Sequence, residues 1–329
     1  MRTLNLEPLG EKLEVRHVTV DEASHGQRLD NFLMRIAKGV PKSHLWRIIR
    51  SGEVRVNRKK ANPSDKVFTG DDIRIPPVRV AMREAKPVPK IDDKDLVVLF
   101  EDKDIIVIDK PAHMAVHGGS GVSFGLIERL RATREAAPFL ELVHRLDKET
   151  SGAIIIAKTR KALVRLHEAI REGKVSKTYL ALLIGECDFD VKHVKNRLLK
   201  FVTKSGERRV RIDSEGQESH SIFKVIERFE GATFVEVNLK TGRTHQIRVH
   251  AASLGHPIVG DDKYGNFEMN DALATGAWGS KFNRMFLHAH RIEFLHPITG
   301  EKLSITAPLP LQCQNLLRAM KDSIDGSKV

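Results

Sequence analysis

The segment HRLDKETSGAIIIAKT, residues 144–159, combines a dense charged stretch with an apolar run. Its second half contains Ala153–Ala157, which is typical of a buried strand, and another apolar run, Phe139–Val143, precedes the charged residues. We therefore expect residues 144–152 to form a tight connection at one end of a sheet. Such connections present side chains at a surface while rigid strands hold them in place.

Asp147 is the residue of this connection best suited to take part in a chemical reaction. Arg145 and Lys148 lie close to it in sequence, and both cations favour an ionised carboxylate. An ionised and oriented carboxylate can act as a nucleophile or as a general base. The structural alternative is that Asp147 only caps the turn together with Thr150 and Ser151. Composition and spacing do not separate these two interpretations.

The sequence around this segment contains many short strands and few helices. Strand-like runs outnumber helical ones and do not alternate regularly with them, which predicts an α+β unit with a largely antiparallel sheet. The expected helices cover residues 160–172 and residues 244–254, the second opened by Thr244. The expected strands cover residues 96–100, 105–109, 153–157, 179–185, 234–239 and 302–306.

A second motif, TGRTHQIRVH, covers residues 241–250. On a helix, Thr244 and Arg248 share one face, while Arg243 and Gln246 point elsewhere. Arginine, glutamine and histidine together suit contacts with phosphates and base edges of a nucleic acid. The alternative is a surface helix without a function.

Positive charge is concentrated near the amino terminus. The 329 residues carry a net charge of +12, and residues 1–90 hold 19 basic and 11 acidic side chains. Residues 27–60 alone hold 10 basic and 2 acidic side chains. A dense basic block on a small unit is the expected footprint of a polyanion binder, whereas a merely solvated face usually carries both signs. The chain length itself predicts two folded units.

The basic block coincides with a compact pattern of two helices and short strands. A first helix follows Arg28, and a second is expected to begin after Ser43 as its N-cap and to end at Gly52, where a left-handed residue is needed. Alternation of apolar and polar residues predicts strands at residues 53–57 and 73–75.

This amino-terminal pattern resembles the S4 RNA-binding domain. The resemblance is carried by RLDNFL (28–33), SHLWRIIRSGEVRVN (43–57) and GDDIRIPP (70–77). It implies that RNA is bound by basic side chains of this unit. The candidates are Arg28, Lys42, Arg47, Arg50, Arg55 and Arg58.

Several other chemistries lack support in the sequence. A Walker loop, a GxGxxG turn and an HExxH motif are absent, so nucleotide hydrolysis, dinucleotide redox chemistry and zinc proteolysis have no motif behind them. Two cysteines are too few for a disulfide framework or a cysteine zinc site. No apolar run approaches the ~20 residues of a membrane helix. We therefore expect a cytoplasmic protein that contacts no membrane.

The histidines do not form a recognisable metal motif. His245 and His250 are five residues apart, and His288 and His290 lie in a strand-like run, without a cysteine or carboxylate at ligand spacing. We expect these histidines to be structural or to contact RNA, and we expect no metal.

Four segments in a fixed order resemble the RluA-type pseudouridine synthases. They are DKPAHMAVHGGSG (109–121), HRLDKETSGAIIIAKT (144–159), KTYLALLIGE (177–186) and LKTGRTHQIRVHAASLGHPIVGDDKYG (239–265). The joint order of four segments is much harder to meet by accident than any one of them. One departure is His113, which stands where the family usually has glycine and puts the local loop geometry in question.

The resemblance implies roles for individual residues. It assigns the essential carboxylate to Asp147, which attacks C1′ or removes a C2′ proton, and it gives Arg248 the position of the ion-pair partner. Arg145 matches the arginine associated with base flipping, and Tyr179 matches a tyrosine that stacks on the flipped uracil and assists proton movement at C5. Further substrate-binding positions in the matched motifs are His144, Thr150, Lys110, Arg243, His245, Gln246 and Ile247.

The resemblance also implies a domain organisation and a substrate. We expect a flexible tail (1–15), an S4-like domain (16–78), a linker (79–90) and a catalytic domain (91–329) with a mostly antiparallel mixed sheet. The combination is most like the family members that act on large-subunit ribosomal RNA, free or in an assembling subunit. We expect a monomer without a cofactor. The alternatives are the same chemistry on transfer RNA or another ribosomal site, and a non-catalytic ribosome assembly factor.

Overall fold

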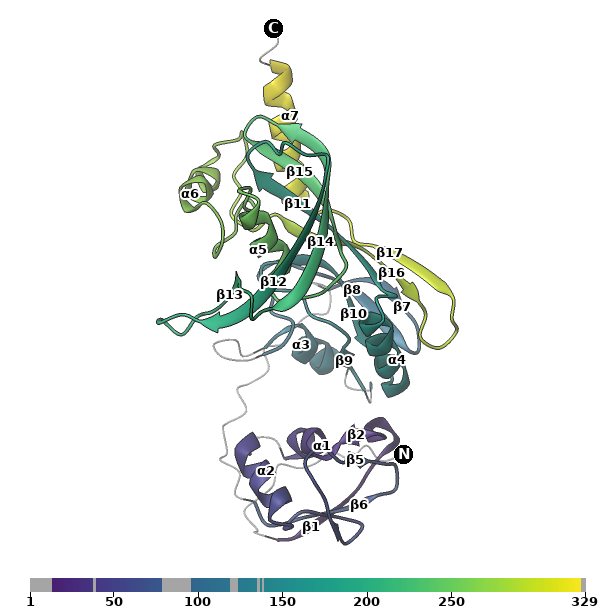
Figure 1. The fold of residues 1–329 in the computed structure, drawn as a ribbon. Coiled ribbons are helices and arrows are strands. Elements are labelled where there is room, and N and C mark those ends of the chain that lie inside the picture. The colour runs from purple at the N-terminus through teal and green to yellow at the C-terminus, as the bar shows by residue number, and fades with distance from the viewer. Residues whose placement is uncertain are drawn as a thin grey trace. The chain divides into compact units, whose positions relative to one another are not determined.

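The computed structural model describes residues 14–37, 40–78, 96–118, 124–134, 137 and 139–326. Two compact units are present, one built on residues 14–78 and one on residues 96–134 and 140–326 (Figure 1). The predicted tail and the predicted linker lie almost wholly outside the described residues. The domain boundaries derived from the sequence therefore stay predictions.

The first unit packs α1 (Leu29–Ile36) and α2 (Lys42–Arg50) against small sheets. Its core contains the fully buried Leu33, Leu45 and Ile73. A four-stranded sheet has the order β1-β6-β3-β4, and β2 pairs with β5. The bounds are β1 (Arg16–Thr19), β2 (Gln27–Arg28), β3 (Arg55–Val56), β4 (Lys59–Lys60), β5 (Lys66–Val67) and β6 (Asp72–Ile75), with a 3₁₀ turn η1 (Glu22–Ser24).

The second helix of this unit begins two residues earlier than the sequence predicts. Pro41 is the N-cap of α2, so Ser43 lies inside the first turn and the predicted Ser43 cap is wrong. Proline suits this boundary because it restricts the backbone and has no N–H to leave unpaired. The predicted end is confirmed, because Gly52 follows the helix with a φ of +81°.

The second unit is built on one large mixed sheet with helices around it. The strands are β7 (Val97–Glu101), β8 (Ile105–Lys110), β9 (Glu141–Leu142), β10 (Ser151–Ala157), β11 (Ser176–Ile184), β12 (Val191–Val202), β13 (Arg208–Ile212), β14 (Gln217–Phe229), β15 (Ala232–Leu239), β16 (Leu287–Leu295) and β17 (Lys302–Thr306). The helices are α3 (Leu126–Thr133), α4 (Arg160–Arg171), α5 (Gln246–Ser253), α6 (Phe267–Thr275) and α7 (Leu311–Gly326).

The main strand order is β13-β12-β14-β15-β11-β16-β10-β8-β7, with β17 on β16 and β9 on β10. Every strand pair of this sheet is antiparallel except β10 and β16, which run parallel. The predicted α+β class with a largely antiparallel sheet is therefore confirmed. Figure 1 shows β12 and β14 as long strands that lead to β13 at one edge of the sheet.

The parallel pair β10–β16 joins the two halves of the sheet at a very close approach. Gly152 lies opposite Ala289 in this pair and has a φ of +112°. A Cβ atom at position 152 would lie 2.3 Å from the carbonyl oxygen of Ala289. Only glycine fits here, and the charged connection 144–150 is thereby held directly at the start of β10.

Two helices pack on different parts of this sheet. The α5 residue Val249 packs on Leu198 and Val210, so that α5 lies against β12 and β13. The predicted start of this helix at Thr244 is wrong, because α5 begins at Gln246 after a left-handed His245. The helix α7 contributes Leu316 to a separate apolar cluster with strands β11, β14 and β15.

Candidate active site

A cavity of about 680 Å³ lies in the second unit between the connection before β10, the strand β11 and the start of α5. Its lining comes from several parts of the sequence. They are residues 143–147 with Thr150, the α4 residues His167, Ile170 and Arg171, the strand residues Lys177, Tyr179 and Leu287, and residues 239–248. The two motifs singled out in the sequence thus meet in one cavity.

Asp147 faces this cavity from the turn before β10. Its side chain is 18% exposed, and its backbone carbonyl accepts a hydrogen bond from the N–H of Thr150 at 3.2 Å. The turn suggested as the structural alternative therefore exists. It is formed by the backbone, however, and it leaves the carboxylate free to face the cavity.

Lys110 fixes this turn from behind. Its Nζ donates hydrogen bonds to the carbonyl oxygens of Pro111 and Met114, both at 2.8 Å, and of Lys148 at 3.2 Å. The side chain is fully buried, and burial lowers the pKa of Lys110 to about 7. The expected contact of Lys110 with substrate disagrees with this placement, because the residue does not line the cavity. Its geometry suits the positioning of the residue next to Asp147.

Arg248 lies in the first turn of α5 and is almost completely buried. Two of its nitrogens donate to Asp261 at 2.5 and 2.7 Å, and one of these also donates to Asp262 at 2.7 Å. Burial opposes the positive charge, but the hydrogen bonds to Asp261 raise the pKa of Arg248 above its ordinary value. The third nitrogen, Nη1, lies 3.9 Å from Oδ2 of Asp147. The predicted pair is thus a long contact, and Asp261 is the main partner.

His245 approaches Asp147 from the other side. Its Nε2 lies 3.9 Å from Oδ2 of Asp147, and its Nδ1 lies 2.8 Å from the hydroxyl of Tyr264. The Tyr264 hydroxyl oxygen also accepts a hydrogen bond from the backbone N–H of Val210, so the Tyr264 hydroxyl can donate its proton to Nδ1 of His245. His245 has a φ of +52°, a conformation that is uncommon outside glycine and concentrated at functional sites.

Tyr179 lies on β11 with its ring in the cavity wall. It is 7% exposed, and burial, with a further contribution from the charge of Asp147, raises the pKa of its hydroxyl. The phenol therefore stays protonated in the free protein. A flat, apolar ring with a single hydroxyl beside a carboxylate is suited to contact with a planar base.

The remaining predicted residues fall into two groups. Arg145 and Arg243 are exposed at the cavity, and Ile247 contributes an apolar side chain. By contrast, Gln246 is buried, and its amide is fully occupied: Nε2 donates to the carbonyl of His220 and to Ser221, while Oε1 accepts from the N–H of Arg243. This amide holds the 241–246 loop together, so the expected base-edge contact by Gln246 disagrees with the structure.

His144 and Thr150 also line the cavity but have structural partners. Nε2 of His144 accepts the N–H of Ile155 at 3.1 Å, and burial lowers the pKa of His144 well below its ordinary value. Thr150 is 2% exposed. Both residues shape the wall on either side of Asp147.

His113 accounts for the departure from glycine in the first motif. It has a φ of +63°, in the left-handed region where glycine is most easily accommodated. Its imidazole forms an ion pair with Glu149, two residues after Asp147. The loop therefore keeps the backbone conformation that suits glycine and adds a side-chain link to the turn that carries Asp147.

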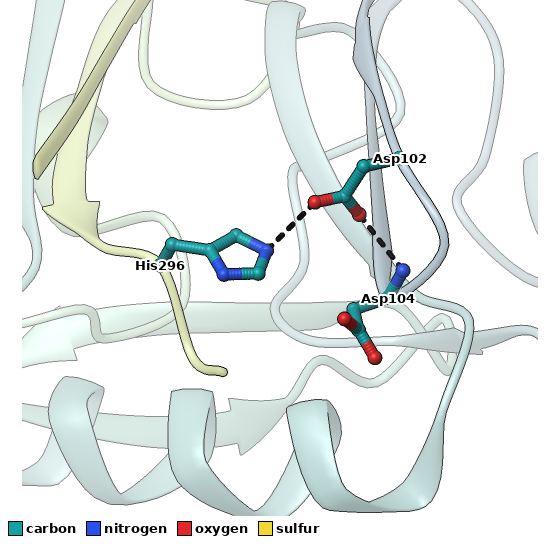
Figure 2. A group of neighbouring side chains, drawn as sticks. All are labelled: Asp102, Asp104 and His296. Atoms are coloured by element: carbon teal, nitrogen blue, oxygen red, sulfur yellow. Dashed lines mark hydrogen bonds and ion pairs between the residues drawn. The ribbon is translucent and has the colours of Figure 1, made fainter. Parts of the chain in front are cut away.

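Outside the cavity, the described residues contain one group with metal-ligand types in proximity. Figure 2 shows Asp102, Asp104 and His296, whose ligand atoms lie within 4.8 Å of one another. Nδ1 of His296 accepts the backbone N–H groups of Ile298 and Thr299, so the proton of the neutral ring is on Nε2, 2.8 Å from Asp102. A protonated nitrogen offers no lone pair to a metal. The group ties the β7–β8 turn to the end of β16.

The histidine pairs considered in the sequence are engaged with the protein. The ring of His250 forms hydrogen bonds with the hydroxyls of Ser219 at Nε2 and Ser221 at Nδ1. The ring of His288 forms hydrogen bonds with the Ser151 hydroxyl at Nδ1 and the Ala307 carbonyl at Nε2. Burial lowers the pKa of both His250 and His288 to about 4. Both rings are therefore neutral structural groups near pH 7.

The basic residues of the first unit gather mainly on and after α2. Lys42 and Arg50 lie over the Trp46 ring, 5.3 and 5.1 Å from its centroid. Arg47, Arg55 and Arg58 are exposed as well. Arg28 is different, because its guanidinium donates two hydrogen bonds to the buried carboxylate of Asp30. That pairing leaves Arg28 with less freedom to bind a phosphate.

Sequence reasoning missed three residues that shape the cavity. Asp261 and Tyr264 both belong to the quoted stretch GDDKYG, and the paired acids 13 and 14 residues after Arg248 were the available signal for an ion pair. Lys177 stands two residues before Tyr179, where strand alternation places both side chains on the same face.

Comparison with known proteins places this fold among RNA-modifying enzymes. The chain belongs to the RNA pseudouridylate synthase family: residues 104–253 match that family, and residues 27–73 match the S4 domain. The protein is therefore an isomerase whose substrate is RNA. No helix in the described ranges is long and apolar enough to cross a membrane.

Among its relatives is the ribosomal large subunit pseudouridine synthase C of Escherichia coli (strain K12), which is 50% identical over 310 residues, or 93% of this chain and 96% of the relative. The protein of that name from Pasteurella multocida is 47% identical and covers 94% of both chains. The structure of human RNA pseudouridylate synthase domain containing 4 shares the fold, with a TM-score of 0.56 and 24% identity over 68% of this chain and 92% of that one.

Proposed function

We propose that this protein isomerises specific uridines of 23S ribosomal RNA, on free RNA or on an assembling large subunit, with Asp147 as the catalytic carboxylate. The relatives at 47–50% identity are named for the large subunit, and they match nearly the whole chain. The observation that carries the catalytic assignment is the Asp147 carboxylate, which faces the cavity within 4 Å of Arg248 and His245.

The reaction breaks the N1–C1′ bond, turns the base and forms a C5–C1′ bond, while the C5 proton leaves to solvent and N1 takes up a proton. Asp147 acts on the ribose, by attack on C1′ or by removal of the C2′ proton. The chemistry of the reaction adds no atom and transfers no electron, so we expect no cofactor. A primary isotope effect from deuterium at C2′ supports proton removal, and its absence supports attack on C1′.

The target base has to leave the RNA stack before Asp147 can reach it. Flipping costs a few kcal/mol for a stacked base, and the vacated space has to be filled or stabilised. Arg145 is exposed at the cavity, two residues before Asp147, and is placed to occupy that space. Tyr179 then stacks on the extruded uracil and assists proton movement at C5.

The S4 unit adds phosphate contacts that select the RNA. Its candidates are the exposed cations around α2, where the Trp46 ring holds both Lys42 and Arg50 through cation–π contacts. Affinity should therefore fall steeply with salt. Deletion of residues 1–90 should impair binding and alter site choice while leaving the chemistry of Asp147 possible.

We propose that the protein acts as a monomer in the cytoplasm. All the residues assigned to catalysis come from the second unit of a single chain, so the proposed site needs no partner copy. A measured mass of twice the chain, unchanged on dilution, would contradict this assignment.

Tritium release from 23S ribosomal RNA labelled at uracil C5 tests the proposal. Wild-type protein should release tritium and the Asp147→Ala variant should not, although both bind RNA. If neither protein releases tritium while both bind, a non-catalytic assembly role is favoured for this RNA. Release from transfer RNA instead would place the same chemistry on another substrate.

A further inference from the structure

Lys177 extends from β11 into the cavity wall, on the same face as Tyr179. Within the described ranges its ammonium makes no hydrogen bond and no ion pair. Burial lowers the pKa of Lys177. A lysine in such a position is costly, because long cationic side chains usually extend to water or pair with a carboxylate.

The surroundings of Lys177 do not compensate for its charge. His144 interacts electrostatically with Lys177, and His167 also lines the cavity. Burial lowers the pKa of each histidine, so neither carries a charge near pH 7. Asp147 is the one carboxylate of the lining and lies against Arg248 and His245. The lining thus has a single acid facing a set of basic residues, which are Arg145, Arg171, Lys177, Lys240, Arg243 and Arg248.

We propose that Lys177 binds a backbone phosphate of the RNA next to the flipped uridine, with Arg171 at the cavity rim as a second contact. The inference rests on the proposed binding of the target nucleotide in this cavity. A full negative charge is the partner that compensates an unpaired ammonium, and lysine binds phosphate as a point charge without demanding one geometry. A neutral uracil oxygen would leave most of that charge uncompensated.

This assignment predicts opposite effects on stability and on binding. Methionine matches the length of the lysine stem and removes the unpaired charge, so Lys177→Met should unfold at the same or a higher temperature than the parent protein. RNA affinity should nevertheless fall. A lysine that only supports the fold would behave in the other way, with a lower unfolding temperature and unchanged affinity.

Binding is best measured in the Asp147→Asn background, where no turnover occurs. The probe is a hairpin of unmodified 23S ribosomal RNA chosen by footprinting with that protein, titrated between 50 and 300 mM KCl. Lys177→Met should weaken binding about tenfold and reduce the slope of log affinity against log salt by about 1. Lys302→Met, a matched change on the exposed strand β17, should alter neither. Weaker binding with an unchanged slope would overturn the phosphate assignment in favour of an uncharged contact.

The phosphate itself is identified by removing its charge. Methylphosphonates are placed singly on the 5′ and the 3′ side of the target uridine. One of the two should weaken binding to the protein with Lys177 more than binding to Lys177→Met, in which only the Arg171 contact to that phosphate remains. Equal losses in both proteins at both positions would refute the contact. Because these measurements use binding alone, they stand even if Asp147→Ala proves active and the catalytic assignment fails.

Discussion

The side chains of Arg248 and Asp261 form a buried ion pair with two hydrogen bonds, and each is at most 2% exposed. The pair orients the guanidinium so that its third nitrogen, Nη1, faces Asp147 at 3.9 Å. Asp262 contacts the same guanidinium from a side chain that is 57% exposed. Asp261 is therefore the residue that fixes Arg248 relative to the carboxylate of Asp147.

Asp261→Asn should lower both stability and turnover. Loss of one partner of a buried pair costs about 3 kcal/mol of unfolding free energy, and a shift of about 1 Å in Arg248 costs on the order of 10²-fold in rate. Denaturant unfolding and tritium release measure the two effects. Asp262→Asn is the matched control and should change each only slightly, because its carboxylate is largely solvated.

The same pair predicts a dependence of stability on pH. Burial opposes the charge of Asp261, but the hydrogen bonds and charge of Arg248 outweigh it and lower the pKa of Asp261. A lowered carboxyl pKa stabilises the fold above the ordinary value of about 4, and this stabilisation is lost as the pH falls through the lowered pKa. Stability should thus fall more steeply below pH 4 in wild type than in Asp261→Asn. Parallel curves would contradict the assignment.

Lys110→Met should reduce kcat through the backbone next to Asp147. The variant removes the donor to the Lys148 carbonyl, so the turn that carries Asp147 loses its support. Tritium-release kinetics should show a lower kcat with a smaller change in KM. Lys103→Met, on the exposed β7–β8 turn, controls for the loss of one positive charge. A variant with full turnover would remove Lys110 from the positioning of the site.

The lowered pKa of Lys110, about 7, gives this lysine a second measurable signature. A lysine whose pKa in the folded protein lies below its ordinary value of about 10.5 destabilises the fold as long as it is protonated in both the folded and the unfolded protein. This destabilisation disappears as the pH rises from about 7 towards about 10.5. The unfolding free energy of wild type should therefore rise over that range relative to Lys110→Met. A constant difference between the two proteins would contradict the burial of a charged Lys110.

His113→Gly should leave activity and stability nearly unchanged. Glycine at position 113 removes about 1 kcal/mol of strain from the left-handed backbone. The greater freedom of the unfolded chain and the loss of the ion pair with Glu149 lower the free energy of unfolding by about the same amount. His113→Val should cost about 2 kcal/mol, because a branched side chain tolerates this φ poorly. Urea unfolding of the three proteins tests the order. A stable valine variant would show that the loop can adopt another conformation.

Arg145→Ala should weaken activity more on a base-paired target than on the same uridine in an open loop. The arginine contributes only where a stacked base has to be replaced, and an unpaired base is cheaper to extrude. Two RNAs that differ only in the strand opposite the target provide the comparison by tritium release. An equal loss on both RNAs would assign Arg145 to binding rather than to flipping.

Much of the fold follows from local patterns in the sequence. The buried run Ala153–Ala157 became the inner strand β10, because burial on two faces leaves a short continuous apolar run. The amphipathic stretch 160–172 became α4, because burial on one stripe leaves a helical period. The helix pair of the first unit was predictable for the same reason. The predicted starts of two helices were wrong. Pro41 rather than Ser43 precedes α2, and the left-handed His245 rather than Thr244 precedes α5.

The rest of the site depends on contacts that sequence spacing does not reveal. The exposed strands β12 and β13 carry too little alternation to be recognised, although they support α5 and thereby Arg248. Gln246 suited base recognition by residue type, yet tertiary hydrogen bonds occupy its whole amide. Lys177 carried no signal of its own, because its significance lies in the absence of a partner among the residues that the structure describes.

The imbalance between the basic cavity lining and its single carboxylate also has a kinetic consequence. A concave surface of one sign focuses the electric field and raises the rate at which an oppositely charged partner arrives by about 10–10³-fold. The capture of a polyanion is then governed by ionic strength through the association step, since the Debye length shrinks to about 8 Å at physiological salt. Competition among proteins for a newly transcribed RNA would favour the one whose site guides the encounter over this distance.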